Sequence, residues 1–132
     1  NINDYKKIFN LIEIETFPIY KEDKNIFINI PKDEDKYYHL YFNDEMNEIK
    51  RNYFTKEDKI IKIKIIIDED IKSLHKLFNK CECIKKINFI KFNKNNINDM
   101  SFMFFECRSL KELNLNNFNT INVTDMSWMF CG

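Results

Sequence analysis

Hydrophobic positions in the second half of the chain recur with a fixed step of 26 residues, which separates Phe78, Phe104 and Phe130. Other apolar columns keep the same step over two or three units: Ile71–Ile97–Val123, Leu74–Met100–Met126, Leu77–Met103–Met129, Cys81–Cys107, Ile84–Leu110, Ile87–Leu113, Phe89–Leu115 and Phe92–Phe118. Apolar residues that repeat in register are typical of a solenoid, in which stacked units bury a shared core.

Each unit is predicted to hold a short helix followed by a short strand. Four apolar residues of the unit 97–122 have the spacing of one helix face: Met100, Met103, Phe104 and Cys107. Asn98 or Asp99 can cap this helix. The pattern L-x-x-L-x-L over residues 110–115 then alternates as a half-buried strand does.

The first half of the chain carries weaker patterns. Apolar residues at helix spacing predict a helix over Asn1–Glu15, although Ile12, Ile14 and Thr16 favour an extended segment as the alternative. Alternating apolar residues predict three strands: Asn25–Ile30, Tyr37–Phe42 and Glu48–Phe54.

The strongest strand pattern is Ile60–Ile67, where Ile61 and Ile63 lie one step before Ile87 and Phe89. It predicts a degenerate first coil over residues 60–70, before units 71–96 and 97–122 and a truncated unit 123–132. Solenoids need an end unit that shields the first coil. Residues 1–59 are therefore predicted to be an α+β N-terminal cap on a solenoid of residues 60–132; a separate domain with its own role is the alternative.

The segment from Cys107 to Phe130, C-x-S-L-K-E-L-N-L-N-N-F-N-T-x-N-V-T-D-M-S-x-M-F, resembles the BspA-like class of leucine-rich repeat found in surface proteins of bacteria and protists. The resemblance is close over Ile97–Gly132 and looser over Ile71–Asn96. Phe118 stands where the commonest leucine-rich pattern has asparagine, and Asn119 follows it. The resemblance implies an α/β solenoid of leucine-rich-repeat type that binds protein partners, and it brings no catalytic residue.

Charge limits the classes of partner. Lysine plus arginine and aspartate plus glutamate number 21 each, so the net formal charge is zero. A nucleic-acid-binding protein needs a net basic face and a polybasic membrane anchor needs a run of cations. Neither nucleic acid nor direct membrane insertion is expected for this segment. A single glycine leaves no glycine-rich phosphate loop.

Residues for catalysis are sparse. His39 and His75 have no nucleophile and orienting acid in a recognisable set, so no enzyme activity is expected. Cys81-x-Cys83 lacks the spacing and the histidines of a zinc knuckle, so neither a metal nor another cofactor is expected. Cys81 and Cys107 share a column and would lie within disulfide range on adjacent coils. The resemblance implies a buried thiol in that column instead.

Two surfaces are candidate binding sites. Residues between the core positions of the predicted strands point outward, as a concave binding face or as a merely solvated one. They are Lys62, Lys64, Lys86, Asn88, Glu112, Asn114 and Asn116. The alternative site is an aromatic patch of Phe102 and Trp128, one step apart, which mark an interaction surface or pack between coils.

These patterns predict a non-enzymatic protein–protein interaction module, a repeat scaffold for surface adhesion or recognition. A purely architectural segment, or a regulatory domain of a longer protein, is the alternative. The resemblance favours a cell-surface or secreted location, with a cytoplasmic one as the alternative. The sequence ends inside a unit, so the predicted helix Thr124–Cys131 is expected to expose apolar side chains and to favour association through the truncated C-terminal end.

Overall fold

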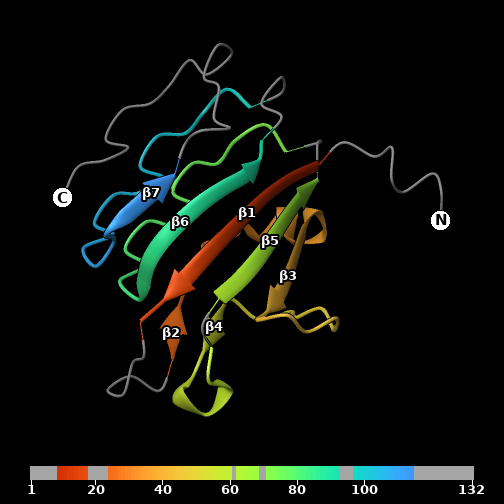
Figure 1. The fold of residues 1–132 in the computed structure, drawn as a ribbon. Coiled ribbons are helices and arrows are strands. Elements are labelled where there is room, and N and C mark those ends of the chain that lie inside the picture. Colours follow the sequence, from red (N-terminus) through yellow and green to blue (C-terminus); the bar gives the residue numbers. More distant parts are fainter. Residues whose placement is uncertain (1–8, 18–23, 61, 69–70, 93–96, 115–132) are drawn as a thin grey trace.

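The computed structural model describes residues 9–17, 24–60, 62–68, 71–92 and 97–114, in which a five-stranded sheet is the largest element (Figure 1). The strands lie in the order β3 (Tyr38–Phe42), β5 (Lys62–Asp68), β1 (Phe9–Thr16), β6 (Ile84–Lys91) and β7 (Glu112–Asn114). β1 is antiparallel to both β5 and β6, whereas β6 and β7 are parallel. The sheet is therefore mixed, and it is open.

A second, two-stranded sheet pairs β2 (Asn25–Ile26) with β4 (Tyr53–Phe54). Two 3₁₀ helices, η2 (Lys32–Tyr37) and η3 (Lys56–Asp58), precede β3 and β5. The strands predicted at 25–30 and 48–54 are longer than the two-residue strands that form there. Pro31 lies directly before η2, and it has no amide hydrogen with which to continue a strand ladder.

β1 lies in the centre of the sheet. The prediction of a helix over Asn1–Glu15 is wrong for residues 9–15, because every second side chain of β1 is buried. Ile12 and Ile14 are completely buried, and such β-branched side chains pack well on a pleated sheet. The Thr16 hydroxyl donates to the Ile60 carbonyl at 3.1 Å. The extended alternative describes these residues correctly.

β6 and β7 pair in the register that the 26-residue step predicts, with Ile87 opposite Leu113. The segments that precede them, residues 71–81 and 97–107, also lie side by side, and we call them the turn ribbons. Four backbone N–H groups of the first ribbon donate to carbonyl oxygens of the second at 2.8 to 3.0 Å. The donor and acceptor pairs are Leu74–Asp99, Lys76–Ser101, Phe78–Met103 and Lys80–Phe105.

Each turn ribbon is a series of tight turns, so the helices predicted from the spacing of Met100, Met103 and Phe104 are wrong. Residues with positive φ recur every fourth position, at Lys76, Lys80, Phe102 and Glu106. A left-handed residue interrupts a right-handed helix. Several amides that would bond within a helix also donate to the neighbouring ribbon instead, which satisfies the backbone in another way.

The predicted fold class, an α/β solenoid of leucine-rich-repeat type with an α+β N-terminal cap, is wrong. β1 enters between β5 and β6, so the three strands predicted as consecutive parallel coils are not all adjacent. Helical structure in the described residues is confined to η2 and η3. The division into 1–59 and 60–132 stays a prediction, and strands from both segments share the five-stranded sheet.

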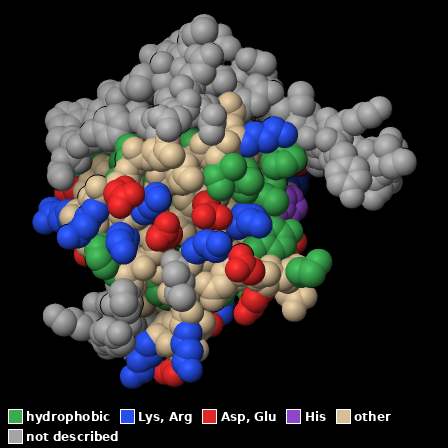
Figure 2. All heavy atoms as spheres, viewed as in Figure 1, with side chains coloured by type: hydrophobic (Ala, Val, Ile, Leu, Met, Phe, Trp, Pro, Cys, Tyr) green, Lys and Arg blue, Asp and Glu red, His purple; other side chains and the backbone are tan. Residues whose placement is uncertain are grey.

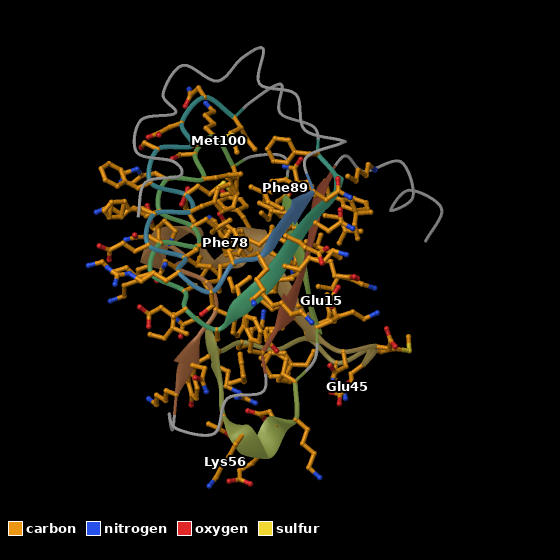
Figure 3. The ribbon with its side chains drawn as sticks, turned by 60° about the vertical axis from the view of Figure 1, so that its left-hand side comes forward. Glu15, Glu45, Lys56, Phe78, Phe89 and Met100 are labelled. Carbon is orange, nitrogen blue, oxygen red and sulfur yellow. The ribbon has the colours of Figure 1, made fainter. Side chains whose placement is uncertain are left out.

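The core lies between the turn ribbons and the inner face of the sheet. Phe78 and Phe104, one step apart, stack with ring centroids 6.1 Å apart and an interplanar angle of 8°. Phe89 of β6 contacts Phe104 edge-on at 6.3 Å. Figure 3 shows Phe78, Phe89 and Met100 on this side of the sheet and Glu15 on the other.

Candidate functional site

The turn ribbons cover one face of the five-stranded sheet, and the side chains on the other face are half-buried or exposed. We call this second surface the open face. Because side chains alternate along each strand, the pairing register arranges the outward side chains in rows across the sheet. One row holds Tyr41, Lys64, Glu13, Asn88 and Asn114, and the next holds Lys62, Glu15, Lys86 and Glu112.

Acidic and basic side chains alternate along the second row. Lys62 lies 3.3 Å from Asp44, while Lys86 lies 3.8 Å from Glu15 and 3.5 Å from Glu112. The hydrogen bond with Asp44 is the main cause that raises the pKa of Lys62. Each exposed pair stabilises by only about 0.2–1 kcal/mol. Together the pairs specify register, because a one-residue slip would turn the β1 glutamates into the core.

Six of the seven residues predicted for the strand face lie on the open face: Lys62, Lys64, Lys86, Asn88, Glu112 and Asn114. The predicted pairing of Lys86 with Glu112 is present. Lys62 was expected beside Asn88, but it faces Glu15 of β1, which separates it from Lys86. Asn116 lies outside the described residues, and a binding role for the whole set stays a prediction.

β1 also brings residues to the open face that sequence reasoning missed. Leu11 stands opposite Ile66, Phe9 follows on the same strand, and Ile90 on β6 is 38% exposed. We call Phe9, Leu11, Ile66 and Ile90 the apolar strip. Lys91 lies over the Phe9 ring, with Nζ 4.1 Å from its centroid. The signal was the alternation in F-N-L-I-E-I-E-T over residues 9–16.

The apolar strip is concentrated at one end of the open face. Figure 2 shows hydrophobic side chains gathered toward one side of the visible surface, while acidic and basic side chains are interleaved over the rest. The register explains this separation, because Phe9 and Leu11 occupy the first half of β1 and the glutamates occupy the second half.

Phe102 is the described member of the predicted aromatic patch. His75 contacts its ring at 5.8 Å and Phe105 at 5.4 Å, both edge-on, and Lys76 Nζ lies 5.9 Å from its centroid. Phe102 is half-buried among these neighbours. Trp128 lies outside the described residues, so a binding role for the pair stays a prediction.

A serine–histidine–aspartate contact lies beside Phe102. Ser101 Oγ is 2.6 Å from His75 Nδ1 and donates to Asp99 Oδ1 at 2.7 Å. A catalytic serine donates to the histidine, and the aspartate orients the histidine, so the order of contacts here is different. Ser101 is also only 3% exposed. The arrangement holds a turn in place rather than preparing a nucleophile.

His39 lies on β3 at the border of the open face. Its Nδ1 is 2.7 Å from Glu48 Oε1, and Lys50 Nζ is 3.3 Å from the same oxygen. Desolvation raises the pKa of Glu48, but the hydrogen bonds with His39 and Lys50 outweigh it, and the net shift is downward. Ile49 N–H also donates to the Leu40 carbonyl at 2.7 Å. His39 therefore helps to hold this segment against β3.

Cys81, Cys83 and Cys107 are buried free thiols, so Cys81 and Cys107 form no disulfide here. Burial is the main cause that raises the pKa of Cys83 to about 12 and that of Cys107 to about 11. The reactive thiolate is therefore scarce at neutral pH. The Cys107 thiol donates to the Phe78 carbonyl at 2.7 Å, which is a structural role.

The described part of the chain was also searched for metal and membrane features. It contains no group of three histidine, cysteine or acidic side chains placed to hold a metal ion. It also contains no helix with the length and apolar character needed to cross a membrane.

A bidentate ion pair holds the segment around β4 and η3. Arg51 Nη1 and Nη2 donate to the two Asp58 carboxylate oxygens at 2.8 and 2.7 Å, and the Thr55 N–H donates to Asp58 at 2.8 Å. The guanidinium also lies 5.1 Å from the centroid of the Phe42 ring. The hydrogen bond with Arg51 is the main cause that lowers the pKa of Asp58 to about 2.

Replacing Asp58 by asparagine is expected to lower the free energy of unfolding by about 1 kcal/mol at neutral pH, because a partly exposed bidentate pair is lost. The folded-state pKa lies below the unfolded one, so the carboxylate stabilises the fold above about pH 4 and loses this effect as the pH falls toward about 2. Urea denaturation of both proteins across this range measures the difference. Glu57→Gln, at an exposed neighbour, is the control and should change stability by less than about 0.5 kcal/mol. A deficit of Asp58→Asn that is unchanged at the acid end contradicts this role.

One family model matches residues 45–132, and its description is Mycoplasma protein of unknown function, DUF285. The matched segment contains β4 to β7 and both turn ribbons, whereas β1 and β3 lie before it. Neither the curated proteins nor the solved structures include a match to this chain. This family is not the BspA-like class that the repeats resemble, and that resemblance stays a prediction.

Proposed function

The chain belongs to the DUF285 family of Mycoplasma proteins of unknown function, and we propose that it is a non-enzymatic protein-interaction module. The proposed binding site is the apolar strip of the open face, bordered by the charged rows. The proposed partner is a protein surface that presents apolar side chains surrounded by charges of both signs.

The observation that carries this proposal is the apolar strip itself. Phe9, Leu11 and Ile66 are half-buried, and Ile90 is exposed, on a surface that is otherwise polar and charged. Apolar side chains gathered on an exposed surface with a polar border are a mark of protein interaction sites. An apolar centre within a polar rim is also the common anatomy of such interfaces.

Charge favours a protein over a polyanion as the partner. Five carboxylates and four lysines alternate around the strip, so the open face has no net basic region of the kind that nucleic acid or an anionic membrane requires. They are Glu13, Glu15, Asp44, Asp68 and Glu112, with Lys62, Lys64, Lys86 and Lys91. A protein surface carries both signs and can complement this arrangement.

A purely architectural segment or a regulatory domain of a longer protein is the alternative. A cell-surface or secreted location, which the BspA-like resemblance favours, is proposed together with the interaction role. The cytoplasmic alternative is retained.

A phage-displayed library of random peptides, selected on the full chain, tests the proposed site. Peptides that bind the wild type should lose about tenfold or more in affinity for Ile66→Lys, because the change removes an apolar contact and introduces a charge that binding must desolvate. Titration of the selected peptides against each purified protein measures this loss.

The matched control is Ile26→Lys, since Ile26 is 48% exposed but lies on β2, outside the five-stranded sheet. Selected peptides should bind this variant as they bind the wild type. Binding that is unaffected by Ile66→Lys would contradict the proposed site. Failure to enrich any peptide would favour the architectural alternative.

A further inference from the structure

We infer that β1 is an exchangeable strand, and that the slot between β5 and β6 accepts the β1 of a second copy of this chain. The product is a dimer in which the open face of each half is built from two copies. This inference goes beyond the proposed function, because it concerns the source of one strand of the face rather than the partner of the face.

The slot and the strand that fills it come from separable parts of the sequence. β5 and β6 both lie within the family-matched segment 45–132, whereas β1 lies before it. Figure 1 shows β1 between these two strands, and both are antiparallel to it. The family-matched segment therefore forms the two walls, and the preceding segment supplies the strand between them.

The fit of β1 depends on side chains that a second copy would supply identically. Ile12 and Ile14 are completely buried in the core. Glu13 stands opposite Lys64, and Glu15 stands between Lys62 and Lys86. An acidic strand between two basic ones is thus recognised by charge and by register. Exchange of an identical element preserves these contacts, which makes swapping a low-cost route to a dimer.

Exchange would place residues of one copy in the candidate site of the other. Phe9 and Leu11 belong to β1, whereas Ile66 and Ile90 belong to the walls of the slot. The apolar strip of a swapped dimer would thus combine two chains. Failure of the exchange would leave the apolar strip complete within one chain, so the peptide-binding test of the proposed function can succeed or fail independently.

The test uses two full-length variants, Glu15→Cys and Lys62→Cys, each with Cys131→Ser. Positions 15 and 62 are directly opposite each other, and opposite residues of antiparallel strands lie within the Cα range of a disulfide. The native side chains are 38% and 36% exposed, so neither change disturbs the core. The two proteins are mixed, unfolded in urea, refolded together and oxidised. A disulfide between different chains is expected, in a share that rises with protein concentration.

Two controls make the outcome decisive. One chain that carries both cysteines should form the link internally, which verifies the β1–β5 pairing. A mixture of Glu15→Cys with Lys56→Cys should link about tenfold less, because Lys56 lies on η3, away from Glu15 (Figure 3). An interchain product no greater than in this mismatched mixture would overturn the inference, and so would failure of the internal link. Native mass spectrometry of mixed ¹⁵N-labelled and unlabelled wild-type chains should show mixed dimers, which requires no substitution.

Discussion

Replacing Phe104 by alanine is expected to lower the free energy of unfolding by about 3–5 kcal/mol. Phe104 is 3% exposed, stacks on Phe78 of the preceding ribbon and meets Phe89 of β6 edge-on. The substitution removes a ring that joins both ribbons to the sheet, and the surrounding backbone cannot close the cavity without breaking hydrogen bonds between the ribbons. Urea denaturation followed by circular dichroism measures the loss.

Phe102→Ala is the matched control, because it removes the same ring from the same ribbon. Phe102 is half-buried and contacts His75, Lys76 and Phe105 on the outer side. The expected cost is about 1 kcal/mol, which reflects the smaller apolar area lost. Similar costs for the two alanine variants would mean that Phe104 does not occupy the core as described.

A second large effect is expected at β1. Ile14→Asp should cost about 4 kcal/mol or more, because it places a carboxylate without a partner in the completely buried position of Ile14. That is a large fraction of the stability of an ordinary domain, which is about 5–15 kcal/mol. We expect loss of the cooperative thermal transition or a strongly lowered Tm, measured by circular dichroism.

Leu11→Asp is the control for this prediction and also separates the strand from the helix. In a strand, residues 11 and 14 point to opposite faces, so Leu11→Asp should cost only about 1 kcal/mol. In a helix they would lie on one face, three residues apart, and the two substitutions would have comparable costs. Comparable losses at Leu11 and Ile14 would therefore contradict the strand.

The sequence identified buried positions better than it identified backbone conformation. Met100, Met103, Phe104 and Cys107 are buried as their spacing predicts. Successive tight turns also direct a side chain inward every three or four residues, so the same spacing fits a helix and a turn ribbon. The difference lies in hydrogen bonds to a segment about 25 residues away, and a local pattern does not carry that information.

The position of β1 could not be predicted for a related reason. The step of 26 residues aligns Ile63 with Phe89 and makes β5 and β6 look like neighbouring strands. The sequence 9–16 has the alternation and the acidic residues needed to fit between them, but only the long-range pairing of Glu15 with Lys62 and Lys86 shows where it goes. Hence the lysines and asparagines of the candidate face were predicted, while the apolar strip was not.

The turn ribbons also hold backbone conformations that the residue types do not favour. The sequence has one glycine, yet Lys76, Lys80, Phe102 and Glu106 have φ between 57° and 60°. Such a conformation costs about 1–2 kcal/mol for each residue that has a Cβ atom.

The amides of Lys76 and Lys80 are among those that donate to the second ribbon, so contact between the ribbons offsets the cost of these corners. A ribbon without its neighbour would keep the strain and lose the hydrogen bonds. The two ribbons should therefore behave as one cooperative folding unit, in which neither persists after the other has opened.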